Sequence, residues 1–315
     1  MSEKIRCLIA DKMHESIETL LEHIGVEVTY QPDITRDHIK SQISNYECLV
    51  IRSKTFVDQD LLQNANRLKF ICRAGAGIDN LEAGWIESKG IKIINAPEGN
   101  RDAVAEHAVG LLLALLNKIV VSHNEVRSGK WDREANRGVE LNNKVVAIIG
   151  YGNMGKAFTK RLSAFGCKIL VYDKYIKEFE YGHQHKSTLQ EIYENADIVS
   201  FHVPLTRETE AWVNDQFINS FKKNIYLINT ARGGIVKNES LVKALNNGKV
   251  LGAALDVLEN EKISRFSELE SRYLDYLLNS GKVIITPHIA GWSLESYYKI
   301  NKVLVDKLED ELRKL

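Results

Sequence analysis

The stretch that decides the fold is Val145-Val-Ala-Ile-Ile-Gly-Tyr-Gly-Asn-Met-Gly155, which a helical pattern over residues 156–165 follows. A run of five apolar residues leads directly into three glycines with the spacing GxGxxG. We expect Gly150 to permit a tight turn, Gly152 to let the backbone approach a pyrophosphate, and Gly155 to let helix and strand pack closely. The N–H groups at the start of the helix would then bind the anion. The stretch therefore predicts the strand, turn and helix of a dinucleotide site.

The acid at the end of the next expected strand indicates which dinucleotide binds. That strand, residues 169–173, ends in Asp173, which lies 18 residues after Gly155. A carboxylate at this point accepts hydrogen bonds from the ribose hydroxyls and repels a 2′-phosphate. We therefore expect the cofactor to be NAD(H). A second glycine-rich segment, residues 73–80, lacks the third glycine and is not expected to bind a dinucleotide.

Short β-branched runs and helical patterns alternate along the whole chain, which predicts parallel sheets with helices on both faces. In the first part, strands are expected at residues 5–10, 26–30, 48–52, 70–73 and 91–95, and helices at 17–23, 39–43 and 81–88. A long helix is then expected from Asn100, as its cap, to about Ser128. The second series of strands is expected at residues 145–150, 169–173, 198–203, 225–230, 252–257 and 283–286.

These patterns predict an α/β protein with two doubly wound parallel-sheet domains. A final helix, residues 294–315, has no strand after it, and we expect it to return to the first domain and make that domain discontinuous. The expected domains are residues 1–99 plus 289–315 for the substrate and residues 100–288 for the dinucleotide.

Composition excludes several classes of protein. Lys plus Arg and Asp plus Glu both number 42, so the chain has no net charge with which to bind nucleic acid. The four cysteines are scattered, which argues against a disulfide framework or a metal site. The apolar stretch of residues 104–121 is interrupted by polar side chains and is expected to be a buried helix, not a membrane span. With no signal-peptide pattern at the first residues, we expect a cytoplasmic protein without membrane partners.

Three polar residues follow late strands of the second series, namely Arg232, Glu261 and His288. Each alone fits a plainer role, as a surface cation, a solvated acid or a loop histidine. Because ligands bind beyond the carboxyl ends of parallel strands, the three are expected to converge where the dinucleotide lies. Together they predict a catalytic site.

With these residues the sequence resembles the D-isomer-specific 2-hydroxyacid dehydrogenase family, and within it the phosphoglycerate dehydrogenase branch without a C-terminal regulatory domain. The resemblance covers the whole chain and rests on residues 52–55, 73–80, 95–107, 202–205, 229–233 and 286–288, together with the GxGxxG segment and Asp173.

The resemblance implies a flavodoxin-like first domain, a Rossmann second domain and a homodimer built on the helix at residues 100–128. It implies that His288 is the general acid/base, that Glu261 hydrogen-bonds His288, and that Arg232 holds the carboxylate of a 2-oxo acid. The implied substrate contacts are Arg52, Ser53, Arg73, Ala74, Gly75 and Ala76. Beyond the three glycines and Asp173, the implied cofactor contacts are Asn153, Met154, Val203, Pro204, Thr230, Ala231, Asp256, Ala290 and Gly291.

Three departures from the family pattern leave alternatives open. Residues 263–280, before the last expected strand, form a longer stretch than usual. Lys262 replaces the usual proline after the catalytic acid, and Glu259 competes with Glu261, which is preferred for its distance from Arg232. Trp292 is bulkier than the residue that the phosphoglycerate branch carries.

The expected activity is NAD-dependent oxidation of a D-2-hydroxy acid or the reverse reduction. The best substrate is 3-phosphoglycerate, because Arg52, Arg73 and Arg133 suit a phosphate. The alternatives are a glyoxylate or hydroxypyruvate reductase, and a non-catalytic protein of the same fold that senses NAD.

Overall fold

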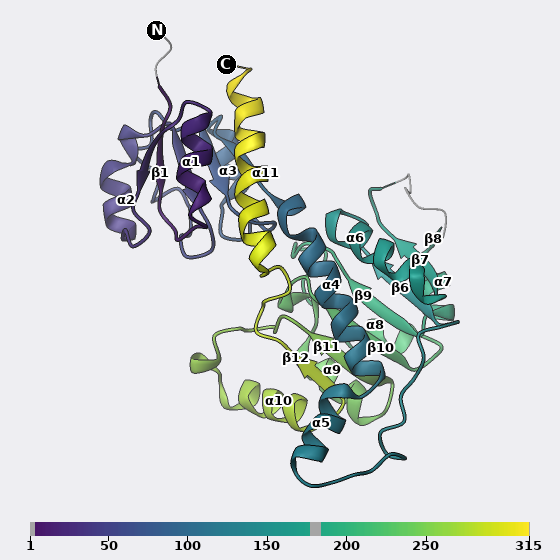
Figure 1. The fold of residues 1–315 in the computed structure, drawn as a ribbon. Helices are drawn as coiled ribbons and strands as arrows, with labels where there is room; N and C mark the ends of the chain where they lie inside the picture. Colours follow the sequence, from purple (N-terminus) through teal and green to yellow (C-terminus); the bar gives the residue numbers. More distant parts are fainter. Residues whose placement is uncertain (1–3, 177–183, 315) are drawn as a thin grey trace. The chain divides into compact units, whose positions relative to one another are not determined.

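The computed structural model describes residues 4–176 and 184–314. The chain divides into two compact units, Met1–Arg101 with Trp292–Leu315, and Asp102–Gly291 (Figure 1). Both contain a parallel sheet, which confirms the predicted fold class. The expected domain boundaries lie within a few residues of these limits.

The first unit is a five-stranded sheet between two layers of helices. Its strands, in the spatial order β2–β1–β3–β4–β5, are all parallel. They are β1 (Arg6–Ile9), β2 (Glu27–Tyr30), β3 (Cys48–Ile51), β4 (Phe70–Arg73) and β5 (Lys92–Asn95). The helices are α1 (Ser16–His23), α2 (Arg36–Gln42), η1 (Ile43–Asn45), α3 (Ala83–Ser88) and α11 (Leu294–Leu312).

Helix α11 returns to the first unit, where it lies beside α1 (Figure 1). Its side chains Ile300 and Leu304 are buried in one core with Ile17 of α1. The expected helix ran to Leu315, which lies outside the described residues. Ser293 begins α11 in a capping box with Ser296, which satisfies N–H groups at the helix start.

The second unit is a seven-stranded parallel sheet in the order β12–β11–β10–β9–β6–β7–β8. Its strands are β6 (Val145–Ile149), β7 (Lys168–Tyr172), β8 (Gln184–Lys186), β9 (Ile198–Phe201), β10 (Ile225–Asn229), β11 (Val250–Leu255) and β12 (Val283–Ile285). Its helices are α5 (Ile119–Arg127), α6 (Asn153–Leu162), η2 (Ser163–Phe165), α7 (Leu189–Asn195), α8 (Asp215–Ser220), η3 (Gly233–Ile235), α9 (Asn238–Asn246), η4 (Ile263–Arg265) and α10 (Glu268–Asn279), with most of α4 (Pro97–Leu116).

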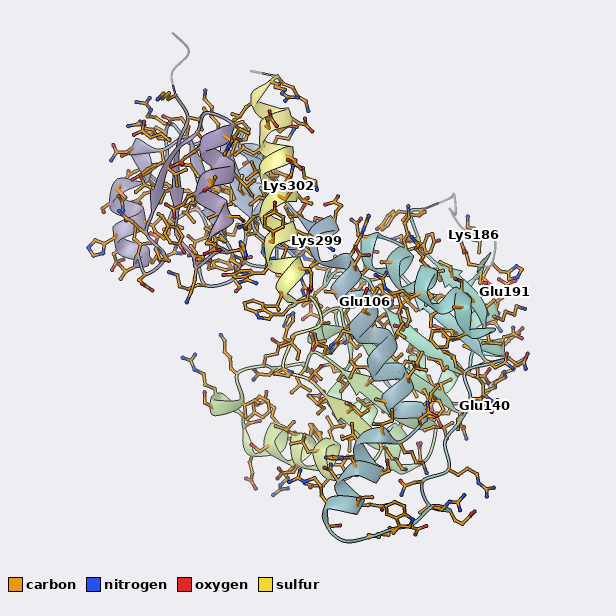
Figure 2. The ribbon with its side chains drawn as sticks, viewed as in Figure 1. Glu106, Glu140, Lys186, Glu191, Lys299 and Lys302 are labelled. Atoms are coloured by element: carbon orange, nitrogen blue, oxygen red, sulfur yellow. The ribbon has the colours of Figure 1, made fainter. Side chains whose placement is uncertain are left out.

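Helices α4 and α6 cover one face of this sheet and bury apolar side chains against it. Arg161 of α6 ties them together, since its guanidinium lies 3.0 Å from the Asp102 carboxylate and 2.8 Å from that of Glu106. Figure 2 labels Glu106 on α4. The first half of α4 is thereby joined to the C-terminal turn of α6.

The single helix expected from Asn100 to Ser128 is wrong at both its start and its middle. Helix α4 begins at Pro97, whose missing N–H costs nothing in the first turn, so Asn100 lies inside the helix and is not its cap. At Lys118 the backbone is left-handed, with φ of 52°, and α5 starts in a new direction. The two helices are bent by 60° relative to one another.

Within the described part of the chain, no single helix has the length and hydropathy of a membrane span. The bent pair α4 and α5 passes that test of length and composition when taken together.

Candidate active site

The glycine turn after β6 has the close contacts that its glycines are expected to permit. Gly150 has φ of 97°, and a Cβ there would lie 2.6 Å from the carbonyl oxygen of His202. A Cβ on Gly155 would lie 2.0 Å from the Gly150 oxygen. Gly152, the N-cap of α6, has open space where its Cβ would be. The turn therefore exposes backbone at the N-terminus of a ten-residue helix, as a pyrophosphate requires.

Asp173 lies at the end of β7, beside this turn. Its carboxylate accepts hydrogen bonds from the backbone N–H of Tyr151 at 2.7 Å, Tyr175 at 2.8 Å and Ile176 at 2.9 Å. Burial raises the pKa of Asp173, but these three hydrogen bonds outweigh it and leave the pKa below its ordinary value. The negative charge is thus fixed next to the turn.

The neighbouring cation does not offset that charge. Both carboxylate oxygens of Glu208 lie 2.8 Å from Nζ of Lys174. Lys174 is therefore paired with Glu208, and the negative charge of Asp173 beside the glycine turn is not neutralised by Lys174. This arrangement favours a ribose with free hydroxyls over one that carries a 2′-phosphate.

The remaining expected cofactor contacts lie at the carboxyl edge of the same sheet. Four strands end there in segments that contain Val203 and Pro204, Thr230 and Ala231, Asp256, and Ala290 and Gly291. The hydroxyl of Thr230 is buried and has no hydrogen-bond partner among the described residues. An unsatisfied hydroxyl at this edge fits a site built for a polar ligand.

His288 and Glu261 form the titratable pair of the site. Nδ1 of His288 lies 3.1 Å and 3.0 Å from the two carboxylate oxygens of Glu261, and both side chains are about half exposed. The hydrogen bond to Glu261 raises the pKa of His288, against opposing contributions from burial and from the charge of Arg232. The imidazole thus stays protonated to higher pH than a free histidine.

Glu259, the competing acid, has a different role in the structure. Its carboxylate accepts the backbone N–H of Asn238 at 2.9 Å, at the first residue of α9. Nζ of Lys237 lies 3.4 Å away. A carboxylate at a helix N-terminus satisfies an N–H and complements the helix dipole, so Glu259 stabilises α9.

Arg232 lies in a tightly packed loop after β10. Nδ2 of Asn229 donates to the Arg232 carbonyl at 2.9 Å, and a Cβ on the next residue, Gly233, would lie 1.7 Å from the carbonyl oxygen of Leu258. The loop after β10 therefore packs directly against the segment after β11 that leads to Glu261. Only glycine at 233 allows this approach.

Asp256 is among the expected cofactor contacts, but the structure buries its side chain to 1% exposure. Its carboxylate accepts hydrogen bonds from the Thr286 hydroxyl at 2.6 Å and from the backbone N–H of Ile289 at 2.9 Å and Ala290 at 2.8 Å. Asp256 thus organises the loop on which His288 lies.

In the first unit, Arg52 packs against two aromatic rings. Its Cζ lies 3.9 Å from the centre of the Trp292 ring and 4.8 Å from that of Tyr297. The carboxylate of Asp11 accepts the Arg52 N–H at 2.6 Å and the Thr55 hydroxyl at 2.7 Å, which fixes the loop that includes Ser53. Trp292 is 62% exposed, so the indole presents a large apolar surface beside the guanidinium.

Arg73 lies in a different environment. Its Nη1 is 1.8 Å from the position that a Cβ on Gly75 would occupy, so the guanidinium lies against the loop of Ala74, Gly75 and Ala76. Nδ2 of Asn95 donates to the Ala76 carbonyl at 2.7 Å and fixes that loop from β5. Arg52 and Arg73 thus do not share one environment within the first unit.

One residue that contacts the loop of Thr286 and His288 was not among the expected site residues. Nε2 of His107, on α4, lies 3.0 Å from Oγ1 of Thr286. The sequence did contain a signal, because His107 is a polar residue within the apolar pattern of a buried helix.

Comparisons with known proteins show the family to which the chain belongs. The NAD binding domain of D-isomer specific 2-hydroxyacid dehydrogenases matches residues 109–290. The chain is 34% identical to D-3-phosphoglycerate dehydrogenase of Methanocaldococcus jannaschii over 98% of its own length and 58% of that protein. It is 35% identical to hydroxypyruvate reductase of Thermotoga maritima over 95% of each chain. It therefore spans little more than half the length of the phosphoglycerate dehydrogenase.

A solved structure shows the same architecture. D-lactate dehydrogenase of Aquifex aeolicus, complexed with NAD and lactic acid, superposes with a TM-score of 0.82 at 26% identity, over 98% of this chain and 96% of that one.

Proposed function

Because the chain belongs to the D-isomer specific 2-hydroxyacid dehydrogenases, we propose that it transfers a hydride between NAD(H) and a D-2-hydroxy acid or the corresponding 2-oxo acid. The observation that carries the proposal is the pair of His288 and Glu261 in the unit that contains the glycine turn. A protein that only senses NAD needs no imidazole with a raised pKa.

In the direction of reduction, the protonated imidazole of His288 donates a proton to the C2 oxygen of the 2-oxo acid. Glu261 accepts the Nδ1 proton, which leaves Nε2 for the substrate. NADH, held at the glycine turn and Asp173, would supply the hydride for C2 and become NAD⁺. Arg232 binds the substrate carboxylate through charge-assisted hydrogen bonds. Oxidation reverses these steps, with neutral His288 as the base.

His202 lies beside the glycine turn, but its chemistry differs from that of His288. Burial lowers the pKa of His202 to about 3, and its Nε2 lies 2.9 Å from the Ser200 hydroxyl. An imidazole that stays neutral at ordinary pH cannot supply the proton for reduction. The low pKa of His202 therefore supports His288 as the residue that transfers the proton.

For the substrate, we propose 3-phosphoglycerate first, as the M. jannaschii relative and the arginines of the first unit suggest. Hydroxypyruvate is the second candidate, because the T. maritima relative matches equally well and because the exposed indole of Trp292 occupies space beside Arg52 that a phosphate would need.

The test compares kcat/KM for 3-phosphohydroxypyruvate and hydroxypyruvate, with NADH, in wild type and in Arg52→Ala. Arg272→Ala, at an exposed position on α10, is the matched control for the loss of an arginine. The phosphate assignment requires a preference for the phosphorylated acid that Arg52→Ala reduces. Equal rates, or a preference for hydroxypyruvate, would assign the second candidate.

We also propose a homodimer. Ile119 and Val126 of α5 are 54% and 51% exposed, and Trp131 in the following loop is 80% exposed. Apolar side chains grouped in this way suit a protein interface. Light scattering should give about twice the chain mass of 35.7 kDa, and Trp131→Ser should shift the protein toward the monomer. A wild-type monomer at micromolar concentration would contradict the proposal.

A further inference from the structure

Behind the loop of His288 lies a second histidine that no step of the reaction uses. His107 projects from α4, and its side chain is 23% exposed. Its Nε2 lies 3.0 Å from Oγ1 of Thr286 and 3.6 Å from Oδ1 of Asp256. Since the Thr286 hydroxyl donates its proton to Asp256 at 2.6 Å, its oxygen accepts the proton on Nε2 of His107.

The chain of hydrogen bonds continues from Asp256 to the backbone around His288. The carbonyl oxygen of Asp256 accepts the His288 N–H at 2.8 Å, and its carboxylate accepts the N–H of Ile289 and of Ala290. His288 itself has φ of 55°, in the left-handed region that residues other than glycine rarely adopt. Such a conformation persists only where the surroundings enforce it. Here three hydrogen bonds to one buried residue do so.

We propose that His107 is a positioning residue for proton transfer. Its Nε2–H fixes Thr286, Thr286 fixes the carboxylate of Asp256, and Asp256 keeps His288 in the conformation that pairs with Glu261. His107 itself contacts neither reacting atoms nor cofactor in this scheme. The kinetic consequence rests on the proposed dehydrogenase function, whereas the effect on His288 does not.

The charges that face His288 decide whether the pKa of His288 rises or falls when His107 is replaced. Glu261 and Asp256 raise the pKa of His288, and Arg232 lowers it. If the loop relaxes, the imidazole loses its contact with Glu261, which is the largest of these contributions. Its pKa then falls, and the alkaline limb of the pH profile for reduction moves to lower pH.

The central variant is His107→Leu, which removes the donor. We expect kcat to fall by about tenfold, which corresponds to the free energy that one buried hydrogen bond contributes. The Kd of NADH is expected to stay unchanged. His107→Gln returns an N–H at similar reach and is expected to restore both kcat and the pH profile. His185→Leu, at an exposed position on β8, is the matched control for the loss of a histidine.

A double-mutant cycle tests whether His107 acts through Thr286. Thr286→Val keeps the shape of the side chain and removes the hydroxyl. If the route is correct, the double variant has the same kcat as Thr286→Val alone, since the link is already broken. Additive losses would mean that His107 acts by another route, and would overturn the proposal.

An NMR titration of the His288 imidazole, assigned with His288→Asn, gives a readout that needs no turnover. The inference predicts a lower His288 pKa in His107→Leu than in wild type or His107→Gln. A lower Tm with an unchanged His288 pKa and pH profile would make His107 merely structural and would overturn the inference. If the pKa falls while wild type oxidises no NADH with any 2-oxo acid, the proposed function fails and the positioning role stands.

Discussion

Replacing Glu261 by glutamine removes the charge that raises the pKa of His288 and keeps an oxygen that can accept the Nδ1 proton. The two side chains are 45% and 49% exposed, so water screens their attraction. A well-formed pair of this exposure is worth about 1 kcal/mol, or about fivefold in an equilibrium constant. Reduction needs protonated His288, so kcat/KM on the alkaline limb should fall about fivefold. On the acid plateau, where the imidazole is protonated in both proteins, the change should be small.

The assay is NADH oxidation by the preferred 2-oxo acid across the pH range, for wild type, Glu261→Gln and Glu259→Gln. Glu259→Gln should leave the alkaline limb unchanged and lower Tm, because Glu259 accepts an N–H at the start of α9. The assignment of Glu261 as the partner of His288 is refuted if Glu259→Gln shifts the alkaline limb of the pH profile. It is also refuted if Glu261→Gln leaves that limb unchanged.

Two further predictions concern the cofactor site. Wild type should have a higher kcat/KM with NADH than with NADPH, and Asp173→Ser should reduce that ratio by removing the fixed charge beside the turn; an unchanged ratio would show that another group selects the cofactor. Gly155→Ala should lower both Tm and NADH affinity, because its Cβ would lie 2.0 Å from the Gly150 oxygen and the turn must open; fluorescence titration with NADH that shows wild-type affinity would contradict this.

The parts of the fold that depend on local pattern could be predicted from the sequence. The run from Val145 to Gly155 combines a buried strand, a turn that only glycine tolerates and a helix start, so several independent constraints agree. The break at Lys118 could not be predicted in this way, because its left-handed backbone depends on where the chain must turn and not on the residue type. Helix α10 (Glu268–Asn279) was also missed, although Ser267 begins it with a capping box.

For the candidate site, the sequence identified the residue types at strand ends but not their contacts. Spacing from Arg232 favoured Glu261 over Glu259. Only the folded path of the segment after β11 shows that Glu261 contacts His288 and that Glu259 contacts the start of α9. The contact of Asp256 with the cofactor stays a prediction. Its carboxylate accepts N–H groups of the His288 loop, which a sequence alone does not show. His107 comes from a distant helix, and its contact with Thr286 exists only in the folded chain.

The central claim is that His288 transfers a proton during NADH-dependent reduction of a 2-oxo acid. The most direct measurement is NADH oxidation by wild type and His288→Asn over a panel of 3-phosphohydroxypyruvate, hydroxypyruvate, glyoxylate and pyruvate, with NADH affinity measured in parallel. The account predicts turnover of at least one acid by wild type, and a loss of about a hundredfold or more in kcat for His288→Asn at unchanged NADH affinity. Comparable turnover by His288→Asn, or NADH binding by wild type without turnover of any acid on the panel, would contradict it.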